Sequence, residues 1–414
     1  MGVDWRGWGV AAVPLTLTLS VSPSVGALEW SVDPLAKAEI RYNDNIRSNP
    51  TLADQTEDLI HQETAQVEGA LASELWDIAG TLRVEEATYT KNSELSTPIY
   101  YIGFDASYQT ELGVWSARLS TLQDSTLTDT LSIDADLVSE HVPFDTDSIS
   151  LGWLRSLDER TQLQLSVGRV DRAYHPIGIS GLRDYEYTTF GSTVTRQYTE
   201  RLNASLSLNF NGFRTPQTHT DSDTLELMAE ATYHLADTLA VSGGFGLRSS
   251  KTKVIIPATF LFESPSLGPI LIPVEEIGKS KSTGPIFSLD ATKSWETYSV
   301  ALSASRSVSP SGFGNETVAT ALQARLTYRF SRRLKGVYTA SLRETSSVGD
   351  NAGTSTQERF QAGPVVTWNM TEDWLLRARY VHMRVDRTIF DTAALGNRFA
   401  LTLEYVWPKI SGSY

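Results

Sequence analysis

The chain has 414 residues, of which 41% are hydrophobic and 10% aromatic; it has no cysteine, and its formal net charge is −14. The lack of cysteine excludes disulfides, thiolate metal sites and a cysteine nucleophile, and the acidic balance argues against a nucleic-acid binder, which would need a basic face. Beyond roughly the first 25 residues, no apolar run is long enough for a transmembrane helix, which requires about 18 residues. The chain is therefore either soluble or a membrane barrel, because only helices and closed barrels satisfy their backbone in lipid.

Residues 1–27 have the pattern of a secretory signal peptide. Arg6 supplies the positive start, the stretch from Trp8 to Val21 is mostly apolar, and Ser24 to Ala27 are small residues of the kind that precede a cleavage site. A buried strand and a membrane anchor are the alternatives. We expect export, and a mature chain of residues 28–414 that forms a single outer-membrane barrel domain.

From about residue 34 onward, apolar and polar residues alternate with a period of two, which is typical of strands with one apolar and one polar face. In 397–407, for example, Phe399, Leu401 and Leu403 alternate with Arg398, Thr402 and Glu404. This pattern predicts about eighteen strands, with sixteen as the alternative count. The predicted ranges are 35–46, 62–75, 76–90, 98–111, 113–125, 146–157, 160–172, 184–198, 201–214, 222–235, 238–251, 281–294, 297–309, 317–331, 333–345, 357–370, 373–386 and 396–408.

The connections between these strands alternate between short and long. Short ones include Leu75-Trp76, Glu200-Arg201 and Ala236-Asp237, whereas 47–61 and 126–145 are long. Tight periplasmic turns and longer extracellular loops are typical of outer-membrane barrels, and a soluble sandwich has no reason to alternate in this way. The fold class we predict is all-β: a transmembrane antiparallel up-and-down β-barrel in the bacterial outer membrane.

Aromatic residues gather near the short turns and the C-terminal end. Indole and phenol rings prefer the lipid–water interface, so we expect an aromatic girdle at the periplasmic side; the alternative is that they are core residues of a soluble protein. The tryptophans of this predicted girdle are Trp76, Trp115, Trp153, Trp295, Trp368, Trp374 and Trp407.

The polar face of the strands is expected to line the lumen, because a charge facing lipid at mid-membrane would cost about 2–4 kcal/mol. The last strands are notably basic and predict a cationic wall that attracts anionic solutes or acidic polysaccharide. The alternative is a solvated lumen in which acidic residues across the barrel, such as Glu226, Glu230 and Asp290, balance this charge. The predicted lumen-lining residues are Arg83, Arg118, Arg325, Arg329, Lys335, Arg343, Arg377, Arg379, Arg398 and Glu404.

Segment 252–280 is unusually apolar for a loop, and its four prolines argue against a regular helix or a central strand. Exposed apolar patches often mark a binding surface. We expect the segment to fold into the mouth as a gate, with Ile255, Phe260, Phe262 and Leu271 as candidate gating residues, or to meet a partner. The alternative is that it packs on its own neighbouring loops.

Catalytic and cofactor motifs are missing from the sequence. There are six histidines, but no HExxH or GxSxG pattern, and the glycine cluster of Gly243, Gly244 and Gly246 lies in a predicted strand and is not a phosphate-binding loop. We therefore expect no enzymatic activity, no cofactor and no metal site; an outer-membrane hydrolase is the disfavoured alternative.

The first strand of the predicted barrel reads Ala38-Glu-Ile-Arg-Tyr-Asn-Asp-Asn-Ile46. A strand that ends in Tyr-x-Asp-Asn-aliphatic at the start of the mature barrel resembles the putative beta-barrel porin 2 family, whose members are often associated with exopolysaccharide secretion. The resemblance implies a role in moving polysaccharide across the outer membrane, beside a periplasmic export protein.

We expect the barrel to be embedded in outer-membrane lipid and to bind no nucleic acid. Three hypotheses for its function follow. The leading one is a channel for exopolysaccharide export. The second is a general diffusion porin for small solutes. The third is a non-conducting structural or adhesion barrel whose loops bind a partner.

Overall fold

The protein is described by a computed structural model that covers residues 28–129, 140–175, 181–264, 268–347, 356–388 and 392–413; within these ranges, the side chains of Leu52, 128–129 and 255–276 are left aside. The predicted signal peptide, 1–27, lies outside the described residues. Apart from the one-turn helix α1 (Thr126–Asp129) and the 3-10 turns Leu52–Asp54 and Ser93–Leu95, the regular structure of the described residues is β-strand. No helix among them is long and apolar enough to cross a membrane.

The strands match the predicted ranges closely, and most ends differ by only a few residues. Outside the 252–280 segment, the largest difference is at β1, which begins at Glu29. The strands are β1 (Glu29–Asn43), β2 (Asp58–Ala72), β3 (Trp76–Tyr89), β4 (Thr97–Thr110), β5 (Gly113–Ser125), β6 (Pro143–Ser156), β7 (Thr161–Tyr174), β8 (Tyr185–Thr199), β9 (Leu202–Thr215), β10 (Thr220–Ala236), β11 (Leu239–Ser264), β12 (Gly268–Ser294), β13 (Tyr298–Ser311), β14 (Asn315–Arg329), β15 (Leu334–Ser347), β16 (Thr356–Asn369), β17 (Trp374–Arg387), β18 (Ala394–Val406) and β19 (Ile410–Ser413).

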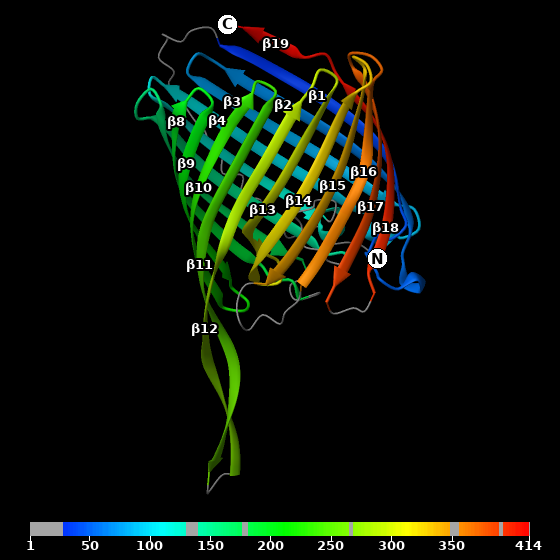
Figure 1. Ribbon diagram of the computed structural model, residues 1–414. Coiled ribbons are helices and arrows are strands. Elements are labelled where there is room, and N and C mark those ends of the chain that lie inside the picture. The colour runs from blue at the N-terminus through cyan, green and yellow to red at the C-terminus, as the bar shows by residue number, and fades with distance from the viewer. Residues whose placement is uncertain are drawn as a thin grey trace.

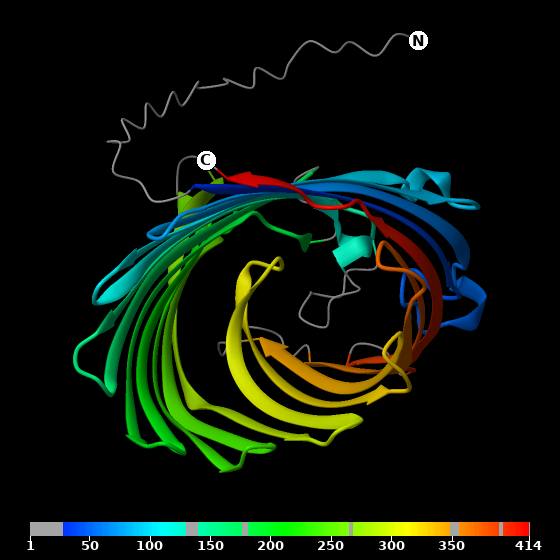
Figure 2. The same ribbon diagram turned by 90° about the horizontal axis from the view of Figure 1, so that it is seen from above.

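Each strand from β1 to β18 pairs antiparallel with the next, and β1 also pairs with β18, so the sheet closes on itself (Figures 1 and 2). The closing register runs from Leu35↔Val406 to Asn43↔Arg398. The four-residue strand β19 extends β18 after a break at Pro408 and pairs with the start of β1. Because β1 pairs with β18, neither the first nor the last strand of the barrel leaves a free edge, which is the condition for a sheet to cross a bilayer.

The period of two in the sequence becomes two faces of the wall. Leu82 on β3, Leu208 on β9 and Leu401 on β18 are each about half exposed, although they lie in the middle of long strands. A soluble protein would not leave a continuous ring of such residues in water, whereas a lipid-embedded barrel places them against acyl chains. The structure is therefore the predicted transmembrane antiparallel up-and-down barrel.

The two ends of the barrel differ. The periplasmic end, at the top of Figure 1 and nearest the C-terminus, carries tight turns such as Ser73–Leu75, where the Ser73 nitrogen donates to the Trp76 oxygen over 2.7 Å. The opposite end carries the longer connections, but not without exception, because β13 and β14 are joined there by only Gly312–Gly314.

Segment 252–280 is the clearest departure from the predicted elements. It continues β11 and β12 as a two-stranded ribbon, and the predicted gating residues lie in its register, with Ile255↔Ile277, Phe260↔Ile272, Phe262↔Ile270 and Leu261↔Leu271. The prediction of a loop without strands is wrong. Beyond Val254, β11 pairs only with β12, so both strands of the ribbon are edge strands, where a proline needs no ladder partner. Figure 1 shows the ribbon extending away from the barrel rather than into its mouth.

The hairpin of β13 and β14 bends the other way. The pairing of β12 with β13 ends at Phe287↔Arg306, so the two strands separate on the extracellular side of this pair. The outer ends of β13 and β14, residues 307–320, here called the inward hairpin, fold inside the barrel outline, as the yellow tip in Figure 2 shows. At the tip, the Arg183 nitrogen donates to the Gly312 oxygen over 2.7 Å. The inward hairpin thus narrows the extracellular mouth.

Candidate functional site: the inner face of the barrel

The strand register places all ten predicted lumen-lining residues on the inner face. Arg398, Thr402 and Glu404 alternate with the exposed Phe399, Leu401 and Leu403 of β18, and the pairings carry this alternation around the wall. The other nine are placed at inner positions by the pairs Arg83↔Tyr101, Arg118↔Asp105, Arg325↔Thr339, Arg329↔Lys335, Arg343↔Arg359, Arg377↔Thr402, Arg379↔Ala400 and Glu404↔Lys37. Their role toward a solute stays a prediction.

Basic residues concentrate on one side of this inner face, over β14 to β18. Arg329 lies opposite Lys335, and Arg343 lies opposite Arg359, which is almost fully buried. Like charges in directly opposed positions destabilise a sheet, so these two pairs lower the stability of the wall locally. The cationic wall predicted from the sequence is therefore present as an arrangement of residues.

Carboxylates balance other parts of the inner face. Arg83 pairs with Glu85, with Nε and Oε1 2.8 Å apart, and Arg118 forms an ion pair with Asp105. Glu230 of β10 accepts a hydrogen bond from the Ser288 hydroxyl over 3.0 Å. The charge of the lumen is thus uneven, with compensated arginines on β3 and β5 and an excess of positive charge near the barrel closure.

Near that closure, residues of four strands line a cavity that we call the arginine pocket. Arg41 is held by Glu39, with Nε and Oε1 2.9 Å apart, and donates through Nη2 to the Gln62 Oε1 over 2.7 Å. Glu39 also accepts from the Thr402 hydroxyl over 2.8 Å. The pocket is lined by Glu39, Arg41, Gln361, Arg379, Val381, Arg398 and Ala400.

A second feature of the inner face is the buried carboxylate Glu316, which belongs to the inward hairpin and is 2% exposed. Its Oε2 accepts hydrogen bonds from the hydroxyls of Ser222 over 2.6 Å and Thr224 over 2.8 Å, both on β10. Because β10 and β14 are not neighbours in the wall, these bonds hold the hairpin against the inner face of β10.

Two apolar clusters lie on the inner side of the wall near the extracellular end. One consists of Val142, Phe144, Tyr174, Leu182, Tyr185 and Phe213; another consists of Ile46, Ile60, Ala87, Tyr89, Leu95 and Leu127. Leu127 belongs to α1, which lies within the barrel outline in Figure 2. At these two places, the described parts of the outer connections pack on the inside of the wall.

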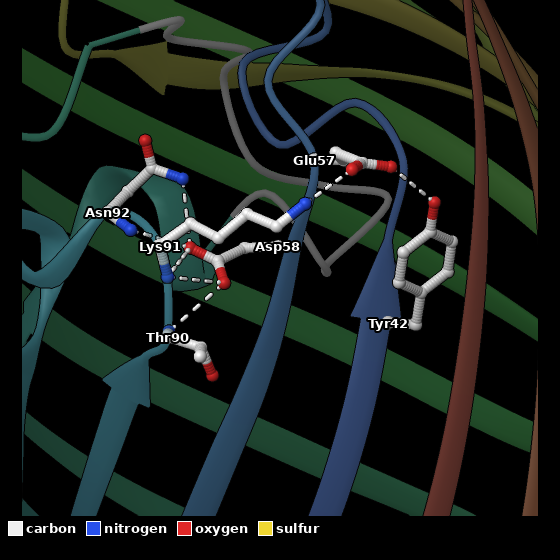
Figure 3. Close-up of polar contacts among 6 residues, drawn as sticks. All are labelled: Tyr42, Glu57, Asp58, Thr90, Lys91 and Asn92. Carbon is white, nitrogen blue, oxygen red and sulfur yellow. Dashed lines mark hydrogen bonds and ion pairs between the residues drawn. The ribbon is translucent and has the colours of Figure 1, made fainter.

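Asp58, the first residue of β2, anchors the connection that follows β3 (Figure 3). Its fully buried carboxylate accepts from the backbone nitrogens of Thr90, Lys91 and Asn92 over 2.9–3.1 Å, and from the Asn92 Nδ2 over 2.8 Å. A carboxylate with this many donors fixes the loop to the strand.

Two ionisable groups in the outer connections have shifted titrations. Lys91 and Tyr42 both donate to Glu57, as Figure 3 shows, and these bonds lower the pKa of the Glu57 carboxyl. Burial and the nearby Arg47 lower the pKa of His141, whose Nε2 lies 2.7 Å from the Thr97 hydroxyl oxygen. Both effects favour the neutral form of His141.

The seven tryptophans of the predicted girdle lie at or near the periplasmic ends of the strands. Several of them are in ring contact: Trp76 with Tyr108 at 4.2 Å between centroids, Trp115 with Trp153 at 5.5 Å, and Trp374 with Tyr405 at 4.7 Å. Trp295, Trp368 and Trp407 are about half exposed on the same rim. This ring matches the interfacial position preferred by indoles.

Sequence reasoning missed several inner residues. Glu39 and Arg41 lie on β1 at inner positions, and the alternation of that strand could have placed them. Glu316 and its hydroxyl partners had no local signal. The run Ser309-Pro-Ser-Gly-Phe-Gly314 did signal a tight turn, and Gly314 adopts a φ of 82°, but it could not indicate that the turn folds inward.

The fold and its two faces define the protein as a transmembrane β-barrel with a polar inner face. The sequence matches no protein-family model and no curated protein. Among solved structures, the chain is similar to the open form of the ferric-catecholate import receptor Fiu from E. coli K12, with 10% identity, a TM-score of 0.49, and 91% of this chain and 81% of that chain covered. It is also similar to OccAB3 of Acinetobacter baumannii (11% identity, TM-score 0.48, 92% and 99% covered) and to OpdL of Pseudomonas aeruginosa (12%, 0.47, 92% and 99%).

Proposed function

We propose that the protein is an outer-membrane channel through which small hydrophilic solutes diffuse. The observation that carries the proposal is the pairing of β1 with β18, which closes a wall that is apolar outside and polar inside. A barrel of this strand number encloses a lumen wide enough for solutes, and the inward hairpin at the mouth sets an upper limit on their size.

The test is planar-bilayer recording with the purified full-length barrel. We expect stepwise increases in current as single barrels insert, and exclusion of larger sugars in a liposome-swelling assay. A correctly folded barrel that inserts without current would contradict the channel and favour a structural or adhesion role.

Export of exopolysaccharide is a finer version of this proposal, and what supports it is the resemblance of residues 38–46 to a secretion-associated family. In the structure, the same motif has a structural role: Asn45 is fully buried and donates through Nδ2 to the carbonyl oxygens of Asn49 and Leu395 over 2.9 and 2.8 Å. Deleting the gene and measuring surface polysaccharide tests the export version. Unchanged polysaccharide output would leave general diffusion as the function.

A further inference from the structure

We infer that the arginine pocket binds the oxyanion group of a small solute, a carboxylate or a phosphate. This inference names the substrate class of the proposed channel and so rests on the proposed function, although the binding itself can be measured without transport.

The first argument is charge. Three arginines and one carboxylate line the pocket, namely Arg41, Arg379, Arg398 and Glu39. Glu39 is already occupied by Arg41 and by the Thr402 hydroxyl. The other acid in reach of Arg398, Asp44, has both carboxylate oxygens engaged by Asn397. Among the described residues, neither carboxylate forms an ion pair with Arg379 or Arg398, so positive charge exceeds negative charge around the cavity.

The second argument is burial. Arg398 is 6% exposed, and its Nε has no hydrogen-bond partner among the described residues. Withdrawing an ionised group from water without a partner carries a large free-energy cost, which an arriving anion would offset. Arg379, in contrast, is exposed at an inner position of the wall, so the pocket combines an exposed arginine with a buried one.

The third argument is shape. Ala400 lies directly opposite both Arg379 on β17 and Arg41 on β1, and Arg398 is the next inner residue on β18. Beside the small side chain of Ala400 lies a cavity of ≈ 60 Å³ that the three arginines border. One water molecule needs only about 10–15 Å³ of such space, so the cavity has room for a carboxylate or phosphate group. Guanidinium forks bind such groups through paired hydrogen bonds.

The experiment measures the thermal unfolding temperature of the full-length barrel in detergent, with sodium acetate, with sodium phosphate, and with sodium chloride at matched ionic strength. A ligand that binds the folded state raises this temperature. We expect acetate, phosphate or both to raise it beyond chloride. Acetate alone would identify a carboxylate site, and phosphate alone would identify a phosphate site. A rise no larger than that with chloride would overturn the inference.

Variants locate the binding. Arg398→Gln should weaken the affinity for the effective anion at least about tenfold, which corresponds to one charge-assisted hydrogen bond, and Ala400→Leu should do so by filling the pocket while keeping every arginine. The matched control is Arg118→Gln. It removes the same charge from an arginine on another part of the wall, and this arginine is already paired with Asp105. Equal anion binding by the control and both pocket variants would overturn the site.

The unfolding temperature of Arg398→Gln without anion is a second test. A structural arginine stabilises the fold without a ligand, whereas an unpaired ligand-binding arginine does not. We expect the variant to unfold at the same or a higher temperature than the wild type in anion-poor buffer, since an unpaired buried charge is removed. A large decrease would indicate a structural role instead. A wild-type barrel that binds the anion but carries no bilayer current would contradict the channel and leave the pocket standing. A bilayer current without anion binding would contradict the pocket and leave the channel standing.

Discussion

Asp44 and Asn397, which lie 353 positions apart in the sequence, hold the first and last strands of the barrel together at its outer end. The Asp44 carboxylate accepts from the backbone nitrogen of Asn397 over 2.6 Å and from its Nδ2 over 2.7 Å. The Asp44 nitrogen donates in return to the Asn397 oxygen over 3.2 Å. The contact continues the ladder of β1 and β18 past its last pair and fixes the connection that carries Asn45.

Removing this contact should loosen barrel closure. We expect Asp44→Ala to lower the free energy of unfolding by about 1–3 kcal/mol, because it leaves the partly buried Asn397 donors without an acceptor. The temperature at which the folded band converts to the unfolded band in gel electrophoresis measures the effect. The control is Asp33→Ala at the other end of β1, where a solvent-exposed ion pair with Lys409 (3.7 Å) should contribute under about 1 kcal/mol.

A double variant sharpens this prediction. If the two side chains act on each other, Asp44→Ala combined with Asn397→Ala should cost less than the sum of the single variants. Strict additivity would mean that the two residues stabilise the barrel separately.

The two faces of the wall give a matched pair of substitutions on β3. Leu82 is 57% exposed and faces lipid, so Leu82→Arg should destabilise the folded barrel by about 2–4 kcal/mol. Its neighbour Thr81 lies on the inner face, and Thr81→Arg should change the stability by about 0.5 kcal/mol or less. Denaturant titration in lipid vesicles measures both. Equal costs would mean that the assignment of the faces is wrong.

The inward hairpin should limit conductance. A side chain at Gly312 would collide with the Tyr174 hydroxyl and come within 3.0 Å of Leu182, so Gly312→Val should push the tip off the wall at a cost of about 1–3 kcal/mol. We expect a larger single-channel current. Gly69→Val is the control, because no atom lies within 4 Å of its added Cβ. An unchanged current in a folded Gly312→Val barrel would mean that the hairpin does not restrict the path.

His141 should make the outer connections sensitive to acid. Its folded pKa is lowered, mainly by burial, so the unfolded state binds the proton more readily than the folded state does. Stability is therefore full above the ordinary histidine pKa of about 6.5 and falls as the pH drops below that value. Thermal unfolding followed against pH should show this fall, and His141→Asn should reduce it. A wild-type profile that stays flat from neutral to mildly acidic pH would contradict the effect.

The strands of the wall could be predicted because the pattern that specifies them lies within each strand's own sequence. Alternation at period two survives on nearly every strand, so the ends of β5 were predicted at Gly113 and Ser125, and the inner position of Arg398 followed from its neighbours Phe399 and Leu401. The tryptophan girdle could be placed in the same way, since each ring lies close to a short turn or to the C-terminal end.

Features that depend on contacts between distant segments could not be predicted. Asp44 finds Asn397 only after the barrel closes, and nothing near Glu316 identifies Ser222 and Thr224 as its partners on β10. The prolines of 252–280 argue only against a helix or a central strand, and the sequence does not reveal that β11 and β12 leave the wall and become edge strands. The arginine pocket likewise depends on register, which brings Arg41, Arg379 and Arg398 together from the first and last two strands of the closed wall.

The central claim, that solutes cross through the inside of this wall, is tested most directly by single-cysteine blocking of the bilayer current. The chain has no native cysteine, so Thr327→Cys on the inner face and Leu326→Cys on the outer face of β14 each introduce a single thiol. We expect a bulky, charged, water-soluble thiol reagent to lower the current of the Thr327→Cys barrel and leave that of Leu326→Cys unchanged. An equal response from the two barrels, or a current that the inner cysteine never affects despite its modification, would contradict passage through the lumen.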